Sequence, residues 1–151
     1  MTAPGSALRM RGNRKLIGWC DMGKKILVAD DEPHILHVVS MKLKNAGYEV
    51  LTAMDGEEAL ELCTTEAPDL VITDYQMPIM TGLELCKALR ASEQTKDVPA
   101  ILLTARGFDL EPAEMTEAGI TMVLAKPFSP REVLGHVKDV LDSKQPKPAV
   151  S

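Results

Sequence analysis

Short apolar runs alternate with amphipathic stretches along most of this chain. Five runs rich in Val, Ile and Leu are each followed by a segment in which apolar residues recur three or four positions apart. A short apolar run predicts a buried strand, and the longer spacing predicts a helix with one buried face. The expected strands cover residues 25–30, 48–52, 69–74, 98–104 and 121–125. The expected helices cover residues 33–46, 56–66, 82–91, 110–118 and 130–141.

The strict alternation of strand and helix predicts the fold class. Strands joined through helices pair in parallel, and the helices then cover both faces of the sheet. The strands are apolar on both sides, which is typical of such buried sheets. We therefore predict an α/β fold with a doubly wound five-stranded parallel sheet, in the order 2-1-3-4-5 of the flavodoxin-like (βα)5 type.

The two ends of the chain differ in texture from this alternating middle. Residues 1–23 interleave Arg and Lys with Gly and show no periodicity, so we expect a disordered basic leader. The apolar stretch at residues 16–20 is shorter than the ~7–15 residues of a signal peptide core. Residues 143–151 contain prolines that block a helix, which predicts a flexible tail. One domain is therefore expected at residues 24–142, with no output domain after it.

Composition excludes several classes of protein. The chain has 151 residues and a formal net charge of -5, which argues against nucleic-acid binding by the domain itself. No apolar run approaches the roughly 18 residues of a membrane helix. Cys20, Cys63 and Cys86 are odd in number and form no CxxC pair, which favours a reduced, cytoplasmic setting. We expect these cysteines to be small buried apolar residues.

Polar residues follow the predicted strands at their carboxyl ends. Asp30 and Asp31 follow the first strand, Asp74 ends the third, Thr104 ends the fourth and Lys126 follows the fifth. The carboxyl ends of parallel strands share one edge of the sheet, and open α/β sheets bind ligands there. Any one of these residues has an ordinary explanation as a helix cap, a turn acid or a surface charge. All five at matching strand ends predict one pocket.

Three carboxylates in one pocket require a cation. At ~4 Å each pair of negative charges costs about 4 kcal/mol at an effective dielectric near 20. Oxygen ligands without His or Cys select a hard ion, and Mg²⁺ fits better than Ca²⁺ because it keeps waters and shares its shell with phosphate. Lys126 would neutralise one oxygen of a phosphoryl group and Thr104 would donate to another. Asp74 is then the in-line nucleophile.

Two other classes of α/β protein fit the residues less well. A phosphatase of the haloacid dehalogenase type also places a nucleophilic Asp at a strand end. It needs a second Asp two residues later, where this chain has Gln76. A nucleotide- or flavin-binding protein would carry a Gly-rich turn after the first strand. The turn at residues 30–33 is acidic instead, and it would repel phosphate.

Four motifs resemble the receiver domain of bacterial two-component response regulators, of the stand-alone, chemotaxis type. They are VADDEP at residues 28–33, DYQMPIMTGLE at 74–84, LTA at 103–105 and KPF at 126–128. The resemblance implies that Asp74 is the phosphoacceptor and that Asp31 and Asp74 ligate Mg²⁺ directly. It also implies that Asp30 acts mainly through water and that the backbone carbonyl of Gln76 completes the metal site. Phosphate-contacting and switch roles fall to Thr104, Ala105 and Lys126, and the bond before Pro127 is expected to be cis.

The resemblance also implies the function of the chain. It would accept a phosphoryl group from a histidine kinase or a histidine phosphotransfer protein, by self-catalysed uptake followed by slow autodephosphorylation, and so would not be an enzyme. Its unknown downstream partner protein would dock on the face formed by the fourth helix, the fifth strand and the fifth helix, without direct contact with nucleic acid or membrane. The alternative is a phosphorylation-independent, receiver-like protein-binding module, which a Mg²⁺ titration would distinguish.

One position departs from the family pattern. The residue three before the lysine is usually Tyr or Phe, and here it is Val123. Valine has one restricted side-chain torsion and no ring to move, so it offers little energy for a switch. We hypothesise that activation instead reorders residues 105–108, where Gly107 permits backbone change and Phe108 offers a ring. By the resemblance, Gln76 and Arg106 tune the lifetime of the acyl phosphate.

Overall fold

The computed structural model describes residues 23–105 and 111–144, which form five strands and five helices in alternation. The expectations for the leader and for residues 106–110 and 145–151 lie outside the described residues. The strands are β1 (Lys25–Ala29), β2 (Glu49–Ala53), β3 (Leu70–Asp74), β4 (Ala100–Thr104) and β5 (Ile120–Ala125). The helices are α1 (Pro33–Asn45), α2 (Gly56–Glu66), α3 (Gly82–Arg90), α4 (Pro112–Ala118) and α5 (Pro130–Lys144).

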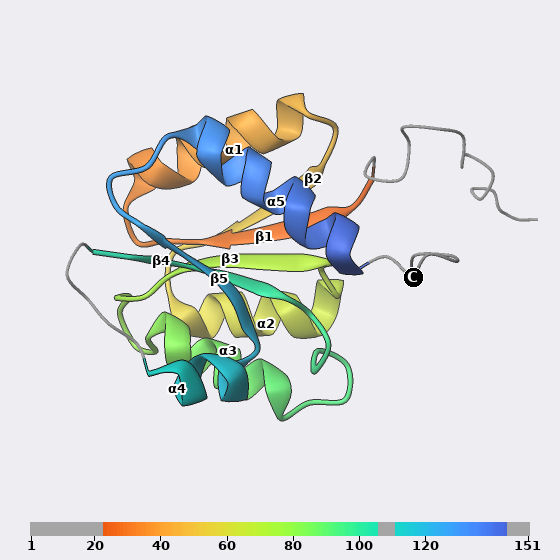
Figure 1. The fold of residues 1–151 in the computed structure, drawn as a ribbon, viewed down its shortest axis with the longest axis vertical. Coiled ribbons are helices and arrows are strands. Elements are labelled where there is room, and N and C mark those ends of the chain that lie inside the picture. The colour runs from red at the N-terminus through yellow and green to blue at the C-terminus, as the bar shows by residue number, and fades with distance from the viewer. Residues whose placement is uncertain (1–22, 106–110, 145–151) are drawn as a thin grey trace, which may run out of the picture.

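The predicted α/β fold is confirmed in both strand order and layering. All strand pairs are parallel, and the order across the sheet is β2-β1-β3-β4-β5. Helices α1 and α5 cover one face of the sheet, and α2, α3 and α4 cover the other (Figure 1). No helix among residues 23–105 and 111–144 is long and apolar enough to cross a membrane.

Most element boundaries agree with the sequence pattern to within two residues, and the differences have local causes. The fourth strand begins at Ala100 and not at residue 98. Pro99 has no N–H to donate to a sheet, and Val98 N–H instead closes a turn onto the Thr95 carbonyl at 3.1 Å. Helix α5 continues to Lys144, three residues beyond the expected end.

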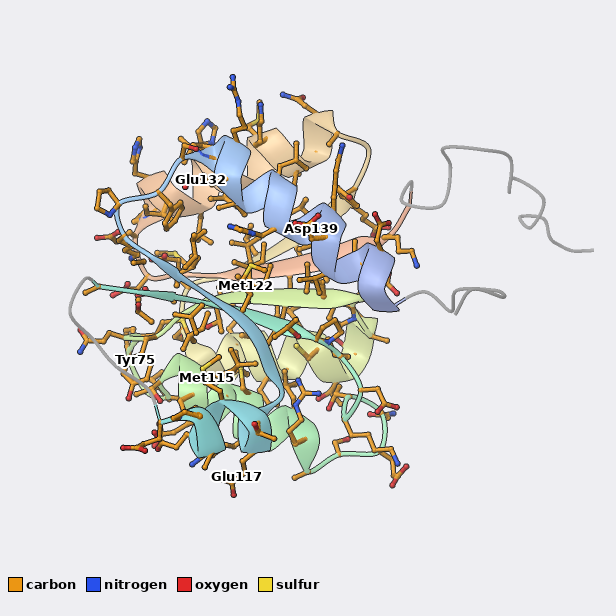
Figure 2. The ribbon with its side chains drawn as sticks, in the orientation of Figure 1. Tyr75, Met115, Glu117, Met122, Glu132 and Asp139 are labelled. Atoms are coloured by element: carbon orange, nitrogen blue, oxygen red, sulfur yellow. The ribbon has the colours of Figure 1, made fainter. Side chains whose placement is uncertain are left out.

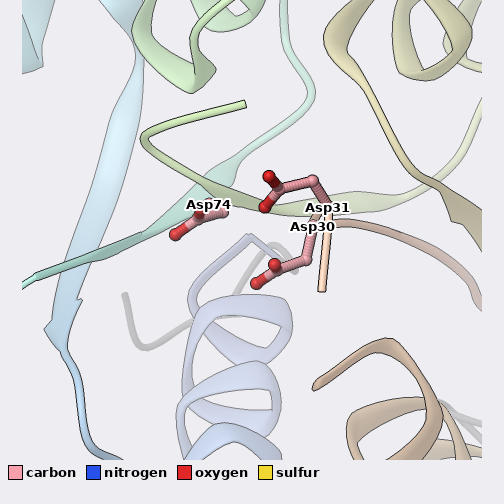
Figure 3. Close-up of side chains that lie close together, drawn as sticks. All are labelled: Asp30, Asp31 and Asp74. Atoms are coloured by element: carbon pink, nitrogen blue, oxygen red, sulfur yellow. The ribbon is translucent and has the colours of Figure 1, made fainter. Parts of the chain in front are cut away.

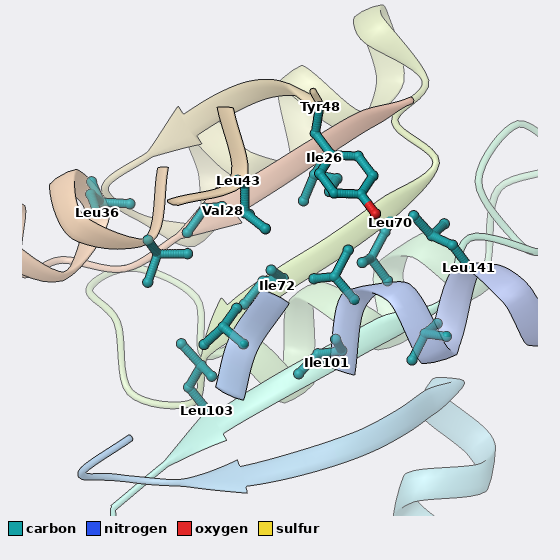
Figure 4. Packing of buried hydrophobic residues seen from close by; sticks show 14 residues of the cluster. Ile26, Val28, Leu36, Leu43, Tyr48, Leu70, Ile72, Ile101, Leu103 and Leu141 are labelled. Carbon is teal, nitrogen blue, oxygen red and sulfur yellow. The ribbon is translucent and has the colours of Figure 1, made fainter. Parts of the chain in front are cut away.

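The core lies on both faces of the sheet, and alternate strand residues point to opposite sides. Ile26, Ile72 and Leu103 face α1 and α5, where 14 buried residues form the largest cluster (Figure 4). Leu27 and Val71 face α2 and α3. Both helical layers therefore bury a complete face of the central strands, which explains why those strands carry no polar alternation.

The two cysteines that the structure describes pack in this core, as expected for small apolar side chains. Cys63 on α2 and Cys86 on α3 are both fully buried and free. Burial raises the pKa of each thiol to about 12. Both thiols therefore stay protonated and unreactive near neutral pH.

The edge strand β5 is less well covered than the centre of the sheet. Its residues alternate between buried or half-buried positions and exposed ones. Met122 packs against the cluster beneath α5, while Met115 of α4 and Tyr75 pack on the opposite side of the sheet (Figure 2). The short helix α4 leaves the outer side of β5 partly open, and Val123 is 36% exposed there.

The polar groups at the amino ends of the strands are paired. Lys25 N–H donates to Asp69 Oδ2 at 2.8 Å, and the Lys25 ammonium lies 3.3 Å from Glu66 Oε1. Arg90, at the end of α3, donates from Nε to the Ala118 carbonyl at 2.9 Å. Its two terminal nitrogens donate to the carbonyls of Lys96 and Val98. Arg90 thus fastens the last residue of α4 to the loop before β4.

Candidate functional site

Three carboxylates lie together at the carboxyl edge of the sheet. Asp30 and Asp31 follow β1, and Asp74 ends the neighbouring strand β3. Each offers a carboxylate oxygen, and these oxygens lie within 4.8 Å of one another (Figure 3). Parallel pairing of β1 with β3, in which Ala29 is level with Thr73, brings the acids together.

Lys126 provides a positive charge within this group. It follows β5, and its Nζ lies 3.0 Å from Asp74 Oδ1 and 3.6 Å from Asp30 Oδ2. The same Nζ lies 3.6 Å from Glu32 Oε1, a fourth carboxylate at the mouth of the site. Burial lowers the pKa of Lys126, but the hydrogen bond to Asp74 and the surrounding carboxylates outweigh this and raise it. Lys126 therefore stays charged.

Asp30 is the most deeply buried of the acids, with an exposed fraction of 0%. Its Oδ1 accepts a hydrogen bond from Glu32 N–H at 2.9 Å. Among the described residues its buried Oδ2 has no hydrogen-bond partner, and it lies 3.6 Å from the shared Lys126 Nζ. Burial raises the pKa of Asp30 to about 6, and the charge of Asp74 adds to the rise. An under-satisfied buried carboxylate of this kind is costly without a cation.

Asp74 is accessible to a ligand in spite of its position at a buried strand end. Burial raises its pKa, the hydrogen bond from Lys126 opposes that rise, and the charges of Asp31 and Glu32 add to it. The carboxylate opens into a pocket of about 310 Å³. The pocket is lined by Asp31, Glu32, Asp74, Tyr75, Gln76, Ala105 and Lys126. Its donor set is rich in oxygen and contains no His or Cys, which fits Mg²⁺.

The loop between β3 and α3 fixes the backbone beside Asp74. Gly82 N–H donates to the Tyr75 carbonyl at 2.8 Å. A Cβ on Gly82 would lie 2.3 Å from the Asp74 carbonyl oxygen, so only glycine permits this close approach. Thr81 caps α3 in a reciprocal pair of hydrogen bonds with Glu84. The start of α3 is therefore held against the strand that carries Asp74.

The remaining predicted residues lie on or just after β3, β4 and β5. Thr104 is buried at the end of β4, and its carbonyl accepts from Lys126 N–H at 2.7 Å. Ala105 and Gln76 line the pocket. The Lys126–Pro127 peptide bond is cis. Val123 lies on β5 in register with Leu102, two positions before the pair of Thr104 with Ala125.

Two residues of the site are not marked by the sequence motifs, and three other predicted residues lie outside the described part of the chain. Glu32 and Tyr75 both line the pocket, although the sequence motifs assign neither a role. Glu32 directly follows the two predicted ligands, so its place in an acidic run was an available signal. The hypothesis that activation reorders residues 105–108 concerns Gly107 and Phe108, which lie outside the described residues, as does Arg106.

The sequence matches the family described as response regulator receiver domain over residues 26–138. A curated relative, the alkaline phosphatase synthesis transcriptional regulatory protein PhoP of Bacillus subtilis, is 44% identical over 80% of this chain and 49% of its own length. The phosphate regulon transcriptional regulatory protein PhoB of Pseudomonas aeruginosa is 38% identical over 80% of this chain and 52% of its own length. The chain thus spans about half the length of these curated relatives.

Solved structures show the same fold. The chemotaxis response regulator CheY4 of Vibrio cholerae matches with a TM-score of 0.73 and 39% identity, covering 79% of this chain and 99% of that one. The receiver domain of the sensor histidine kinase PA1611 of Pseudomonas aeruginosa matches with a TM-score of 0.69 and 29% identity, covering 78% of this chain and 96% of that one. That structure is described as having a magnesium ion coordinated in its active-site cleft.

Proposed function

This chain belongs to the response regulator receiver domain family, and from that membership we propose that it is the phosphoacceptor of a two-component phosphorelay. The observation that carries the proposal is the Asp74 carboxylate, which faces an open pocket with the Lys126 ammonium 3.0 Å away. The donor is a phosphohistidine on a histidine kinase or a histidine phosphotransfer protein. The protein acts in the cytoplasm, where such donors present their histidines.

The acidic group holds Mg²⁺ in this proposal. Asp31 and Asp74 would ligate the ion directly, Asp30 would hold it mainly through water, and the Gln76 backbone carbonyl would complete the protein ligands. The bound ion would neutralise charge shared between Asp74 and the incoming phosphoryl group. The orphaned Asp30 Oδ2 supports this assignment, because a cation with its waters would supply the missing partner.

Phosphoryl transfer then uses groups of this chain. An Asp74 carboxylate oxygen attacks phosphorus in line with the leaving imidazole; the new O–P bond forms as the N–P bond breaks, and the imidazole takes its proton from solvent. Lys126 stabilises one equatorial oxygen, while the Thr104 hydroxyl and the Ala105 N–H donate to others. Water later hydrolyses the acyl phosphate slowly. The chain is thus consumed and regenerated as a signal carrier and is not an enzyme with a separate substrate.

The output is a change in protein binding on the face formed by α4, β5 and α5. Val123, 36% exposed on β5, belongs to this face. We assign no direct nucleic-acid contact to the domain, since the net charge of the whole chain is -5. The match to the chemotaxis response regulator CheY4 is a precedent for output by protein binding. The longer relatives PhoP and PhoB are named as transcriptional regulators, which is the competing precedent.

Phosphorylation with a small donor tests the proposal. Wild-type protein with Mg²⁺ and acetyl phosphate should gain the mass of one phosphoryl group, and Asp74→Asn should gain none. Asp139→Asn, which alters an exposed carboxylate on α5, is the matched control and should behave as wild type. Undiminished labelling of Asp74→Asn would move the acceptor elsewhere. If wild type binds neither Mg²⁺ nor phosphoryl groups, the phosphorylation-independent binding module becomes the better description.

A further inference from the structure

The ammonium group of Lys126 is shared among three carboxylates. Its Nζ lies 3.0 Å from Asp74 Oδ1 and 3.6 Å from Asp30 Oδ2. It also lies 3.6 Å from Glu32 Oε1. An ammonium has three N–H donors, so these three oxygens can occupy all of them. Of the described residues that line the pocket, Lys126 alone is positively charged. A phosphoryl oxygen that pairs with Lys126 must therefore take the place of one carboxylate.

Burial decides which of these carboxylates can leave. The side chains of Asp30 and Asp74 are 0% and 9% exposed, and Asp74 is the proposed acceptor itself. The Glu32 side chain is 59% exposed at the mouth of the pocket. It can turn into water and stay hydrated, whereas a buried carboxylate that loses Lys126 would be left as an unpaired charge. Glu32 is thus the carboxylate that an incoming phosphoryl group would displace.

The backbone of Glu32 serves the fold, but its side chain does not. Glu32 is the N-cap of α1, where its N–H donates to Asp30 Oδ1 at 2.9 Å and its carbonyl accepts from Leu36 N–H at 3.1 Å. Its side chain makes no capping hydrogen bond. Ser, Thr, Asp and Asn are preferred at an N-cap because their short side chains bond the first turn of the helix. The longer Glu32 side chain reaches Lys126 instead.

We propose that Glu32 is a specificity-determining residue that competes with free phosphate-bearing anions for Lys126. The proposal rests on the proposed function, because it gives Glu32 a part in phosphoryl uptake at Asp74. A small donor such as acetyl phosphate carries two negative charges, and it meets the Glu32 carboxylate before it reaches Lys126. Inorganic phosphate meets the same repulsion. A donor protein adds contacts outside the pocket, and these offset the repulsion. Glu32 therefore favours a protein donor over small phosphate anions.

Beryllofluoride, an anion that mimics a phosphoryl group, tests this competition without a chemical step. With saturating Mg²⁺, Glu32→Gln should bind beryllofluoride about three- to five-fold more tightly than wild type, as expected for the loss of one exposed charge near another. In about 1 M salt the difference should shrink, because the screening length is then about 3 Å. Titration calorimetry measures the affinities. Glu61→Gln, which removes the same charge from an exposed position on α2, is the control and should match wild type.

Phosphorylation by acetyl phosphate gives a second measurement. Glu32→Gln should lower the KM for acetyl phosphate by a similar factor and leave kcat nearly unchanged, because the charge acts on anion binding and not on the in-line transfer. Glu32→Asp keeps the negative charge and should stay closer to wild type than Glu32→Gln. An unchanged Tm of both variants confirms that the fold is intact.

Each other outcome has a defined meaning. Equal beryllofluoride affinity of Glu32→Gln and wild type would overturn the proposal, and so would a gain that does not depend on salt. Weaker Mg²⁺ binding by Glu32→Gln, titrated without beryllofluoride, would make Glu32 a metal ligand and not a competitor for Lys126. A fall in kcat at constant KM would assign Glu32 to the transfer step. If wild type takes no phosphoryl group while Glu32→Gln still binds beryllofluoride more tightly, the proposed function fails and the competition at Lys126 stands.

Discussion

The polar groups at the two ends of the sheet differ in how completely they are hydrogen-bonded. At the amino ends of the strands, Asp69 and the Lys25 backbone bond each other at 2.7 and 2.8 Å, and Arg90 reaches three carbonyls. At the carboxyl ends, Asp30 keeps an oxygen that has no hydrogen-bond partner in the described part of the chain, and Asp74 shares Lys126 with two other carboxylates. Both ends belong to the same strands and helices.

This difference separates polar groups that hold the fold from those that await a ligand. For paired groups such as Arg90, hydrogen bonds within the protein compensate for the loss of hydration. Under-paired groups such as Asp30 raise the free energy of the folded state, and a bound cation would lower it again. Removing a paired polar group at the amino ends of the strands should therefore destabilise the fold. Neutralising an under-paired carboxylate at the carboxyl ends should stabilise it.

The largest effect is expected at the amino ends. Arg90→Met leaves three carbonyls unpaired and should lower the free energy of unfolding by about 3 kcal/mol, at about 1 kcal/mol for each lost bond. Urea denaturation measures the loss. Arg131→Met, an exposed change on α5, is the control and should stay within about 0.5 kcal/mol of wild type. If Arg90→Met has the same free energy of unfolding as wild type, these hydrogen bonds do not stabilise the fold.

A second prediction concerns the metal ligands. Asp31→Ala should weaken Mg²⁺ binding at least about ten-fold, since even outer ligands of metal sites contribute that much. Asp30→Ala should weaken it less, because a carboxylate that acts through water loses less than a direct ligand. Titration calorimetry or intrinsic fluorescence with Mg²⁺ gives both constants. Equal or reversed losses would contradict the division of roles.

Neutralising Asp30 should have a smaller effect, of the opposite sign to Arg90→Met. Without metal, Asp30→Asn keeps the Oδ1 acceptor for Glu32 N–H but removes a buried charge. It should raise the free energy of unfolding by about 1 kcal/mol. Saturating Mg²⁺ should narrow or reverse this gain, because the ion stabilises wild type more. Thermal melts with EDTA and with Mg²⁺ provide the comparison; a loss of stability in EDTA would contradict it.

The smallest expected effect is a pH dependence of the stability difference between Asp30→Asn and wild type. The pKa of Asp30 in the folded protein is about 6, above its ordinary value of 3.8, so the folded chain holds this proton more tightly than the unfolded chain does. The ionised carboxylate therefore destabilises the metal-free fold above pH ~6, and this penalty fades as the pH falls towards ~4. The Tm gap between Asp30→Asn and wild type should narrow from pH 7 to pH 5. A widening gap would contradict the sign.

Sequence alone predicted the features that depend on strand ends. Asp30, Asp31, Asp74 and Lys126 meet because parallel strands share a carboxyl edge, which alternation already implied. It could not predict contacts that depend on side-chain reach. Arg90 pairs with the Ala118 carbonyl 28 residues away, and no local pattern marks it.

Backbone conformation is the second feature that the sequence pattern does not predict. The motif at residues 74–84 contains Ile79, but its positive φ arises from the turn that joins β3 to α3 and not from any preference of isoleucine. Similarly, the apolar neighbours of Pro99 predict that it belongs to the fourth strand, but it cannot donate to a sheet, and the strand begins after it. Apolar pattern locates an element, and hydrogen-bond capacity sets where it ends.

The order of the site residues along the chain bears on how the protein is made. The three carboxylates lie within the first 74 residues, whereas the lysine that balances them follows the last strand, at position 126. A ribosome releases the amino end first, and domains fold as chain becomes available. A nascent chain that ends before β5 thus carries the full repulsion of the acids without their cation. The positive charge beside the acids therefore arrives only when the edge strand β5 docks on β4.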